Sequence, residues 1–189
     1  MDSVVSHRFR DVITSASQLR NVVGPENRWF TSRISDKLDK QCQRFIARSP
    51  FLVIGSTNPG GHVDMSPRGD RPGFVHVLDA STLAIPDRRG NRRVDTFHNV
   101  LQSPGVGLIF LVPGERETLR VGGTALIVRD RAICSALAAE NRVPDLALIV
   151  TVERAFFHCG ACMKRSKLWE GVGTNQVANG ADPDLALRG

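Results

Sequence analysis

The spacing of hydrophobic positions changes near residue 50, and the change separates a helical stretch from a strand-rich one. Between residues 35 and 49 the apolar side chains recur at intervals of four, three and one, which places them on one face of a helix: Leu38, Cys42, Phe45 and Ile46. Ser35 is a suitable N-cap, and Pro50 follows Ser49 as a stop signal. The pattern predicts one amphipathic helix ahead of the strands.

After Pro50, short apolar runs alternate with turn sequences. Six runs are predicted to be strands, at residues 51–56, 73–78, 82–85, 105–112, 118–128 and 146–152. Short helices are predicted at 95–102 and 131–140, and they do not alternate regularly with the strands, which disfavours a doubly wound α/β fold. We predict a mainly β fold with six antiparallel strands in a barrel and flanking helices.

The length of 189 residues is sufficient for one hydrophobic core. We expect an N-terminal arm or helix at residues 1–34, the barrel at 35–170, and a flexible tail rich in Gly, Asn and Asp at 171–189. Apolar runs fall well short of the roughly 20 residues that cross a bilayer, and the first residues do not resemble a secretion signal. A cytoplasmic protein with no membrane partner is the expectation.

The net charge of +6 indicates an anionic partner, and the distribution of arginine suggests its size. Four arginines cluster in one turn-like segment around Gly90 and Asn91: Arg88, Arg89, Arg92 and Arg93. Paired guanidinium N–H groups and the start of the following helix suit a single phosphate group. With no tyrosine and 6% aromatic residues, the chain offers few stacking platforms for nucleic acid, so none is expected. The alternative is a solvated loop paired with Asp87 and Asp95.

Two further segments carry polar groups suited to a heteroaromatic ligand. Ser66, Arg68 and Asp70 project from a stretch shaped by glycine and proline, although a charged β-turn explains the same composition. Arg165 and Trp169 are spaced four apart, so they share a face if the segment is helical, and the indole could then pack on a planar ligand. A tryptophan packed in the core is the alternative.

The cysteines do not predict a metal site. Cys159 and Cys162 have the C-x-x-C spacing of a redox pair or of half a zinc site, but no second pair of ligands follows or precedes them, and His158 alone does not complete the set. The context is not the βαβ unit of a thioredoxin-like motif. We interpret these cysteines as structural or incidental thiols, with redox activity and metal binding as alternatives.

Four stretches together resemble the pyridoxamine 5′-phosphate oxidase-like flavoproteins. They are SPRGDRPGFV at 66–75, IPDRRGNRRVDTFHNV at 85–100, LIFLVPGERETLRVGGTALI at 108–127 and FFHCGACMKRSKLW at 156–169. The resemblance implies a split β-barrel that forms a homodimer, with flavin mononucleotide (FMN) in each of two grooves at the interface. This chain departs from many relatives by having Val94-Asp95-Thr96 in place of a serine-arginine-lysine run, and Ala161 in place of a lysine.

The resemblance also implies which residues hold the cofactor. The phosphate contacts fall on Arg88, Asn91, Arg92 and Arg93, the contacts to the ring and ribityl chain on Ser66, Arg68 and Asp70, and further ring contacts, often across the dimer, on Arg165, Ser166 and Trp169. No catalytic residue is assigned, because the flavin would supply the chemistry. The expected function is an FMN-dependent oxidoreductase acting on an unknown small molecule; the alternatives are a non-catalytic flavin or haem binding protein or sensor, and a basic regulatory protein that binds nucleic acid.

Overall fold

The computed structural model describes residues 9–26 and 33–170, so the predicted tail at 171–189 lies outside the described residues. The contacts separate a unit that ends at Arg33 from one that begins at Ile34. The first contains helix α1, Ala16–Val23, which Ser15 caps: its hydroxyl accepts from the Gln18 N–H, and the Gln18 side chain accepts from the Ser15 N–H. This capping box satisfies backbone donors that a helix start otherwise leaves unpaired.

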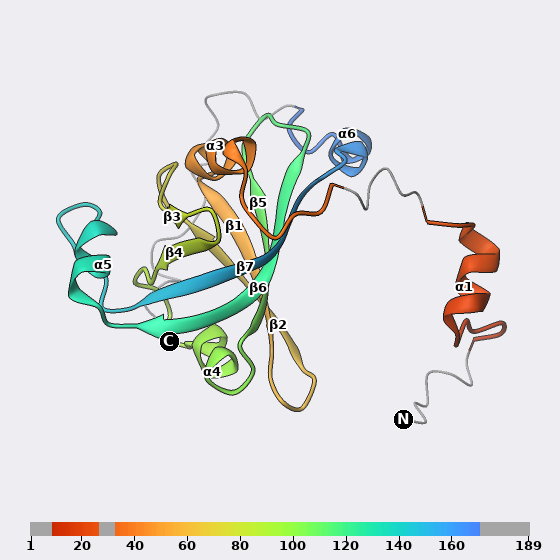
Figure 1. Cartoon of the computed structure of the whole chain (residues 1–189), viewed down its shortest axis with the longest axis horizontal. Coiled ribbons are helices and arrows are strands. Elements are labelled where there is room, and N and C mark those ends of the chain that lie inside the picture. Colours follow the sequence, from red (N-terminus) through yellow and green to blue (C-terminus); the bar gives the residue numbers. More distant parts are fainter. Residues whose placement is uncertain (1–8, 27–32, 171–189) are drawn as a thin grey trace, which may run out of the picture. The chain divides into compact units, whose positions relative to one another are not determined.

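The second unit is built on one curved antiparallel sheet in the order β2-β1-β5-β6-β7-β4-β3 (Figure 1). The strands are β1 Phe51–Thr57, β2 Val63–Gly69, β3 His76–Asp79, β4 Thr82–Pro86, β5 Gly105–Leu111, β6 Thr118–Val128 and β7 Ala147–His158. Mainly β architecture with antiparallel pairing is therefore confirmed. The prediction of six strands is wrong, because the described residues form seven.

The strand that the sequence prediction missed is β2. Its sequence, VDMSPRG, contains no buried hydrophobic residue, and its alternate positions are only half-buried. It pairs with β1 alone and forms an edge of the sheet, where Pro67 is tolerated because a backbone N–H is not needed on the open side. A polar edge strand of this kind does not produce the apolar run on which the prediction relied.

Four short helices accompany the sheet: α3 Lys40–Arg48, α4 Asp95–Gln102, α5 Arg131–Ala136 and α6 Ala161–Ser166. The bounds of α4 match the prediction, whereas α5 ends at Ala136 instead of residue 140. Ser35 is not the N-cap of α3, because its N–H and C=O both pair with Ala155; Asp39 caps the helix by accepting from the Cys42 N–H at 2.7 Å. Within the described ranges, no helix is long and apolar enough to cross a membrane.

The main hydrophobic core lies on the concave side of the sheet, between α3 and α4. Alternate side chains of β1, β5, β6 and β7 point into it, and α3 contributes Phe45 and Ile46 while α4 contributes Phe97 and Val100. A smaller cluster on the other side of β4 and β7 is covered by α5, through Cys134 and neighbouring Leu137. The outer side of β2, β1 and β5 faces away from both clusters.

Two ion pairs close the gap between the ends of the curved sheet. Arg68 of β2 contacts Asp87, which follows β4, with 3.3 Å between Nη1 and Oδ1. Asp70 contacts Arg88, with 2.6 Å between Oδ2 and Nε. Strand β2 is one edge of the sheet, and β4 lies next to the other edge. Among the described strands, β2 and β4 are not paired by backbone hydrogen bonds, so side chains join them. We call these four residues the ion-pair seam.

Candidate functional site

The ion-pair seam brings together two of the three segments that the sequence singled out. Ser66 and Arg68 lie on the half-buried face of β2, and Asp70, also half-buried, follows the end of the strand. The Arg68 guanidinium lies over the Phe97 ring of α4, 5.7 Å from its centroid. Arg88 also donates to the Leu137 carbonyl at 2.9 Å, so its guanidinium is held by protein groups on two sides.

Burial shifts the pKa of Asp87 more than the ion pair with Arg68 does. The carboxylate is removed from water at the seam, which raises its pKa, and the negative charge of Asp145 acts in the same direction. The Arg68 guanidinium opposes this shift through its charge and hydrogen bond, but it does not cancel it. Asp87 is therefore a carboxylate whose charged form is costly inside the fold.

This shift predicts a pH dependence of stability. Because the pKa of Asp87 is higher in the folded than in the unfolded chain, its contribution is most favourable at low pH and is lost as the pH rises through the folded value. We expect the free energy of unfolding of the wild type, relative to that of Asp87→Asn, to increase as the pH is lowered from about 7 to about 4. Urea unfolding at a series of pH values measures the difference; a gap that stays constant or shrinks contradicts the assignment.

The arginine-rich loop retains positive charge that the protein does not neutralise. Arg93 pairs with Asp95 at 2.8 Å, and its N–H donates to the Asn91 side chain. Arg89 and Arg92 are exposed, and neither has a side-chain hydrogen bond or ion pair within residues 9–26 and 33–170. Two uncompensated guanidinium groups on one loop suit a phosphate dianion.

The loop also leaves the start of α4 without a side-chain cap. Val94 occupies the N-cap position with φ 53°, in the left-handed region, and makes no capping hydrogen bond. This backbone conformation is costly for a β-branched residue, and residues held in this way cluster at binding sites. The uncapped N–H groups of α4 are a second set of anion donors beside the two arginines.

Two buried polar atoms near the start of α4 have no partner among the described residues. They are Nε of Arg68 and Oγ1 of Thr96, which lies in the first turn of the helix. Burying such groups unpaired costs about 1–3 kcal/mol each, and most buried polar atoms in native proteins are satisfied. Together with the surplus arginines they form a donor set that fits the phosphate and the polar edges of a nucleotide such as FMN.

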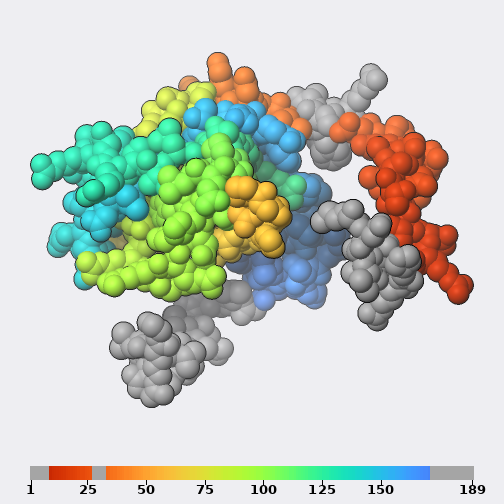
Figure 2. Space-filling model, turned by 90° about the horizontal axis from the view of Figure 1, so that it is seen from below, coloured from red at the N-terminus to blue at the C-terminus, as the bar shows by residue number. Residues whose placement is uncertain are grey.

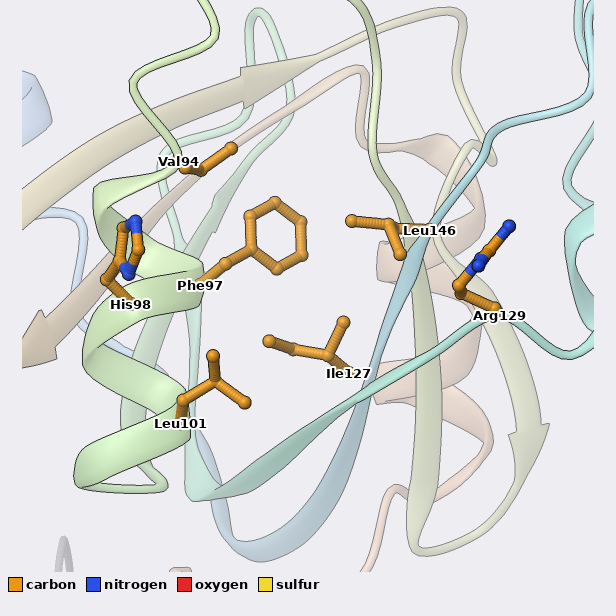
Figure 3. A pocket seen from close by; sticks show the side chains of 7 residues that line it. All are labelled: Val94, Phe97, His98, Leu101, Ile127, Arg129 and Leu146. Atoms are coloured by element: carbon orange, nitrogen blue, oxygen red, sulfur yellow. The ribbon is translucent and has the colours of Figure 1, made fainter.

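An apolar pocket of about 420 Å³ adjoins this donor set. The side chains of Val94, Phe97, Leu101, Ile127 and Leu146 converge on the space between α4 and the end of β6 (Figure 3). His98 and Arg129 are the polar side chains of its lining. The space-filling view shows α4 and the neighbouring β1–β2 hairpin at the surface of the face seen from below (Figure 2).

The lining of this pocket was not predicted from the sequence. Val94, Phe97 and Leu101 are spaced three and four apart, which predicts a helix face but not a pocket beside it. Ile127 and Arg129 come from the end of a strand, and only folding brings them to α4.

The C-terminal candidates lie at the other end of β6. Trp169 Nε1 donates to the Glu115 carbonyl at 2.8 Å, Ser166 donates to the Met163 carbonyl, and Arg165 is exposed. Arg165 and Trp169 were expected to share a helix face only if the segment were helical as far as Trp169, and this condition is not met, because α6 ends at Ser166. The 11 residues of β6 span roughly 30 Å when extended, and they separate this cluster from the arginine-rich loop.

Comparison with known proteins gives the fold a family. Residues 38–159, more than half of the chain, match the sequence profile of the pyridoxamine 5′-phosphate oxidase family. None of the curated proteins compared with the sequence matches it.

Solved structures show the same fold. The protein HupZ of Group A Streptococcus superposes with a TM-score of 0.53 at 18% identity, over 63% of this chain and 92% of that one. A provisionally assigned pyridoxamine 5′-phosphate oxidase of Lactobacillus delbrueckii gives 0.52 at 18% identity, over 65% and 95% of the two chains. With the profile match and the seven-stranded sheet, these findings show that the chain belongs to the pyridoxamine 5′-phosphate oxidase family.

Proposed function

We propose that the protein binds FMN at the arginine-rich loop and acts as a flavin-dependent oxidoreductase on a small molecule. The observation that carries the proposal is the unsatisfied donor set at the start of α4: the free Arg89 and Arg92, the uncapped helix, and the orphaned atoms of Arg68 and Thr96. A phosphate with two negative charges satisfies the cations, and the polar edge of a planar ring satisfies buried donors.

Each candidate residue has a role in this proposal. Arg89 joins Arg88, Asn91, Arg92 and Arg93 at the phosphate, with Arg88 mainly fixing the loop through the seam. Ser66, Arg68 and Asp70 face the ring and ribityl chain from β2. When bound, the flavin supplies transfer of a hydride or an electron pair, while the apolar pocket excludes water beside it.

We infer a homodimer because the candidate contacts are divided between the two ends of β6. Because β6 separates the loop before α4 from Trp169 within one protomer, we assign the C-terminal contacts of Arg165, Ser166 and Trp169 to the partner subunit.

The outer side of the sheet offers a surface for this second copy. Register aligns Met65, Gly55, Gly107 and Gly122 in one row across β2, β1, β5 and β6. The Met65 side chain lies over Gly55, and at exposed Gly107 a Cβ would meet no atom within 4 Å, so another surface can approach the backbone there. Met65 is 57% exposed, and Arg120 on the same side has a buried Nε with no partner among the described residues. These groups favour a second copy of the chain at this face.

FMN binding is tested by titration with two flavins. Arg92→Ala is expected to weaken FMN affinity about tenfold, corresponding to about 1.5 kcal/mol for one charge-assisted hydrogen bond. The affinity for riboflavin, which lacks the phosphate, is expected to stay unchanged. Quenching of flavin fluorescence gives both constants, and Arg142→Ala, an exposed arginine outside the loop, is the matched control. Equal losses for both flavins, or no loss for either, would reject a phosphate role for the loop.

A non-catalytic flavin or haem binding protein is the second candidate, and the pocket lining favours it. The lining is mostly apolar, with His98 and Arg129 as its polar side chains, so the chain places few acid or base groups there. The absorption spectrum of the purified protein separates flavin from haem. Oxidation of reduced nicotinamide by the FMN-loaded protein then separates an enzyme from a carrier.

A further inference from the structure

Two exposed thiols lie where β7 ends and α6 begins. Cys159 follows β7 directly, and Cys162 lies in the first turn of α6. Both are free and exposed, whereas Cys42 and Cys134 are free and buried in the cores. The function proposed above uses neither exposed thiol.

The backbone turns between the two cysteines. Gly160 is the N-cap of α6, and its carbonyl accepts from the Lys164 N–H at 3.0 Å, so the chain turns into the helix directly after Cys159. Cys159 precedes this turn and Cys162 lies in the first turn of the helix, with the C-x-x-C spacing of a redox pair. Cysteines with this spacing at the start of a helix can join in a disulfide within one turn.

The turn that carries the thiols is fixed at both ends. A Cβ at Gly160 would lie 2.1 Å from the Arg116 carbonyl oxygen, so this backbone packs directly on the loop before β6. Beyond α6, Trp169 donates to the carbonyl of the adjacent Glu115. The described residues contain no group of three or more His, Cys, Asp or Glu side chains that could hold a metal ion.

We propose that Cys159 and Cys162 are a redox-active dithiol that undergoes exchange with an anionic low-molecular-weight disulfide such as glutathione disulfide. One thiolate attacks a sulfur of that disulfide, which forms a mixed disulfide and releases one thiol. The second cysteine loses its proton and attacks the protein sulfur of the mixed disulfide, which releases the second thiol. Two protein thiols are oxidised and one small disulfide is reduced to two thiols.

The charges nearby favour an anionic reactant. Lys164, Arg165 and Lys167 lie within or next to α6, against Glu170, which pairs with Lys167 at 3.3 Å. The closed disulfide fixes the first turn of the helix that carries Arg165 and leads to Trp169. Its effect on the flavin rests on the proposed function, whereas the thiol exchange does not.

The test uses the full-length protein without flavin, treated with glutathione disulfide at neutral pH and analysed by intact mass and peptide mapping. The wild type is expected to lose the mass of two hydrogen atoms and to yield a linked peptide joining Cys159 and Cys162. Cys159→Ser and Cys162→Ser are each expected to retain one glutathione, because no second thiol resolves the mixed disulfide. Cys42 and Cys134 are internal controls that react only after unfolding; burial raises the pKa of the Cys42 thiol to about 12.

Two results would overturn the proposal: two glutathiones retained on the wild type, or native thiols at both positions that do not react. The FMN affinity of the reduced protein is measured separately, so a failure of the dithiol is distinguishable from a failure of the flavin site. If both hold, FMN affinity is expected to differ at least threefold between the reduced and oxidised proteins. Cys159→Ser takes up glutathione but forms no disulfide between the two positions, so its FMN affinity is expected to stay the same after treatment.

Discussion

Gly123→Ala is expected to lower the free energy of unfolding by about 3 kcal/mol, the upper end of the usual cost of overpacking. Gly123 lies at an irregularity in the pairing of β6 with β7, where the register shifts between Gly122 and Gly123. A Cβ there would lie 1.9 Å from the Thr151 carbonyl oxygen and 3.2 Å from the Glu153 nitrogen. Both neighbours are backbone atoms of a paired strand, so they cannot move aside as a flexible side chain would.

Urea unfolding at a fixed protein concentration measures the effect, since dimerisation would make the midpoint depend on concentration. Gly105→Ala is the matched control within a strand, because a Cβ at Gly105 meets no atom within 4 Å. Its stability is expected to stay the same or to rise by about 0.5 kcal/mol, since alanine loses less backbone entropy on folding. An unchanged urea midpoint for Gly123→Ala would show that the strands can separate locally at little cost.

Arg68→Met is expected to reduce both stability and FMN affinity. Methionine keeps much of the apolar contact with Phe97 but leaves the Asp87 carboxylate without its ion-pair partner. Loss of one member of a buried pair costs about 3–5 kcal/mol, and since these side chains are 19% and 27% exposed, we expect about 2 kcal/mol in the free energy of unfolding. FMN affinity is expected to fall about tenfold or more, because the orphaned Nε is removed with the charge.

The double variant Arg68→Met with Asp87→Asn separates the two effects. Removing both charges eliminates the unpaired carboxylate, so most of the lost stability is expected to return. FMN affinity is expected to stay low, because the arginine donors are still missing. Recovery of FMN affinity in the double variant would show that Arg68 acts on the ligand only by supporting the fold.

The parts of the fold that the sequence predicted are those in which apolar residues recur with a clear period. The bounds of β6 and α4 were predicted to the residue, because each has an apolar pattern between distinct breaks in the chain. The start of α3 was not, because Ser35 has the chemistry of a cap but its backbone is used by Ala155, more than a hundred residues away. Where a helix starts can depend on backbone pairing between distant segments, and such pairing cannot be seen in a single sequence.

The candidate site was predictable in composition but not in arrangement. The cluster of arginines was visible, and so was its suitability for phosphate. The sequence does not show which arginines remain uncompensated, because the partner of Arg88 is Asp70, which follows β2. Arg89, left out of the predicted contacts, retains its charge. A shared face for Arg165 and Trp169 depended on the helix reaching Trp169, but α6 ends at Ser166, and the left-handed Lys167 that ends it has no marked signal in the sequence.

The way the two ends of the sheet meet has a mechanical consequence. In a barrel closed by backbone hydrogen bonds, a change of diameter requires neighbouring strands to shift in register. A shift by one residue moves the core-facing side chains of a strand to its outer face. Here the closing contacts are the Arg68–Asp87 and Asp70–Arg88 pairs, carried on side chains long enough to give way while every strand keeps its neighbour. The gap between the two ends of the sheet can therefore widen or narrow while the strand ladder stays intact.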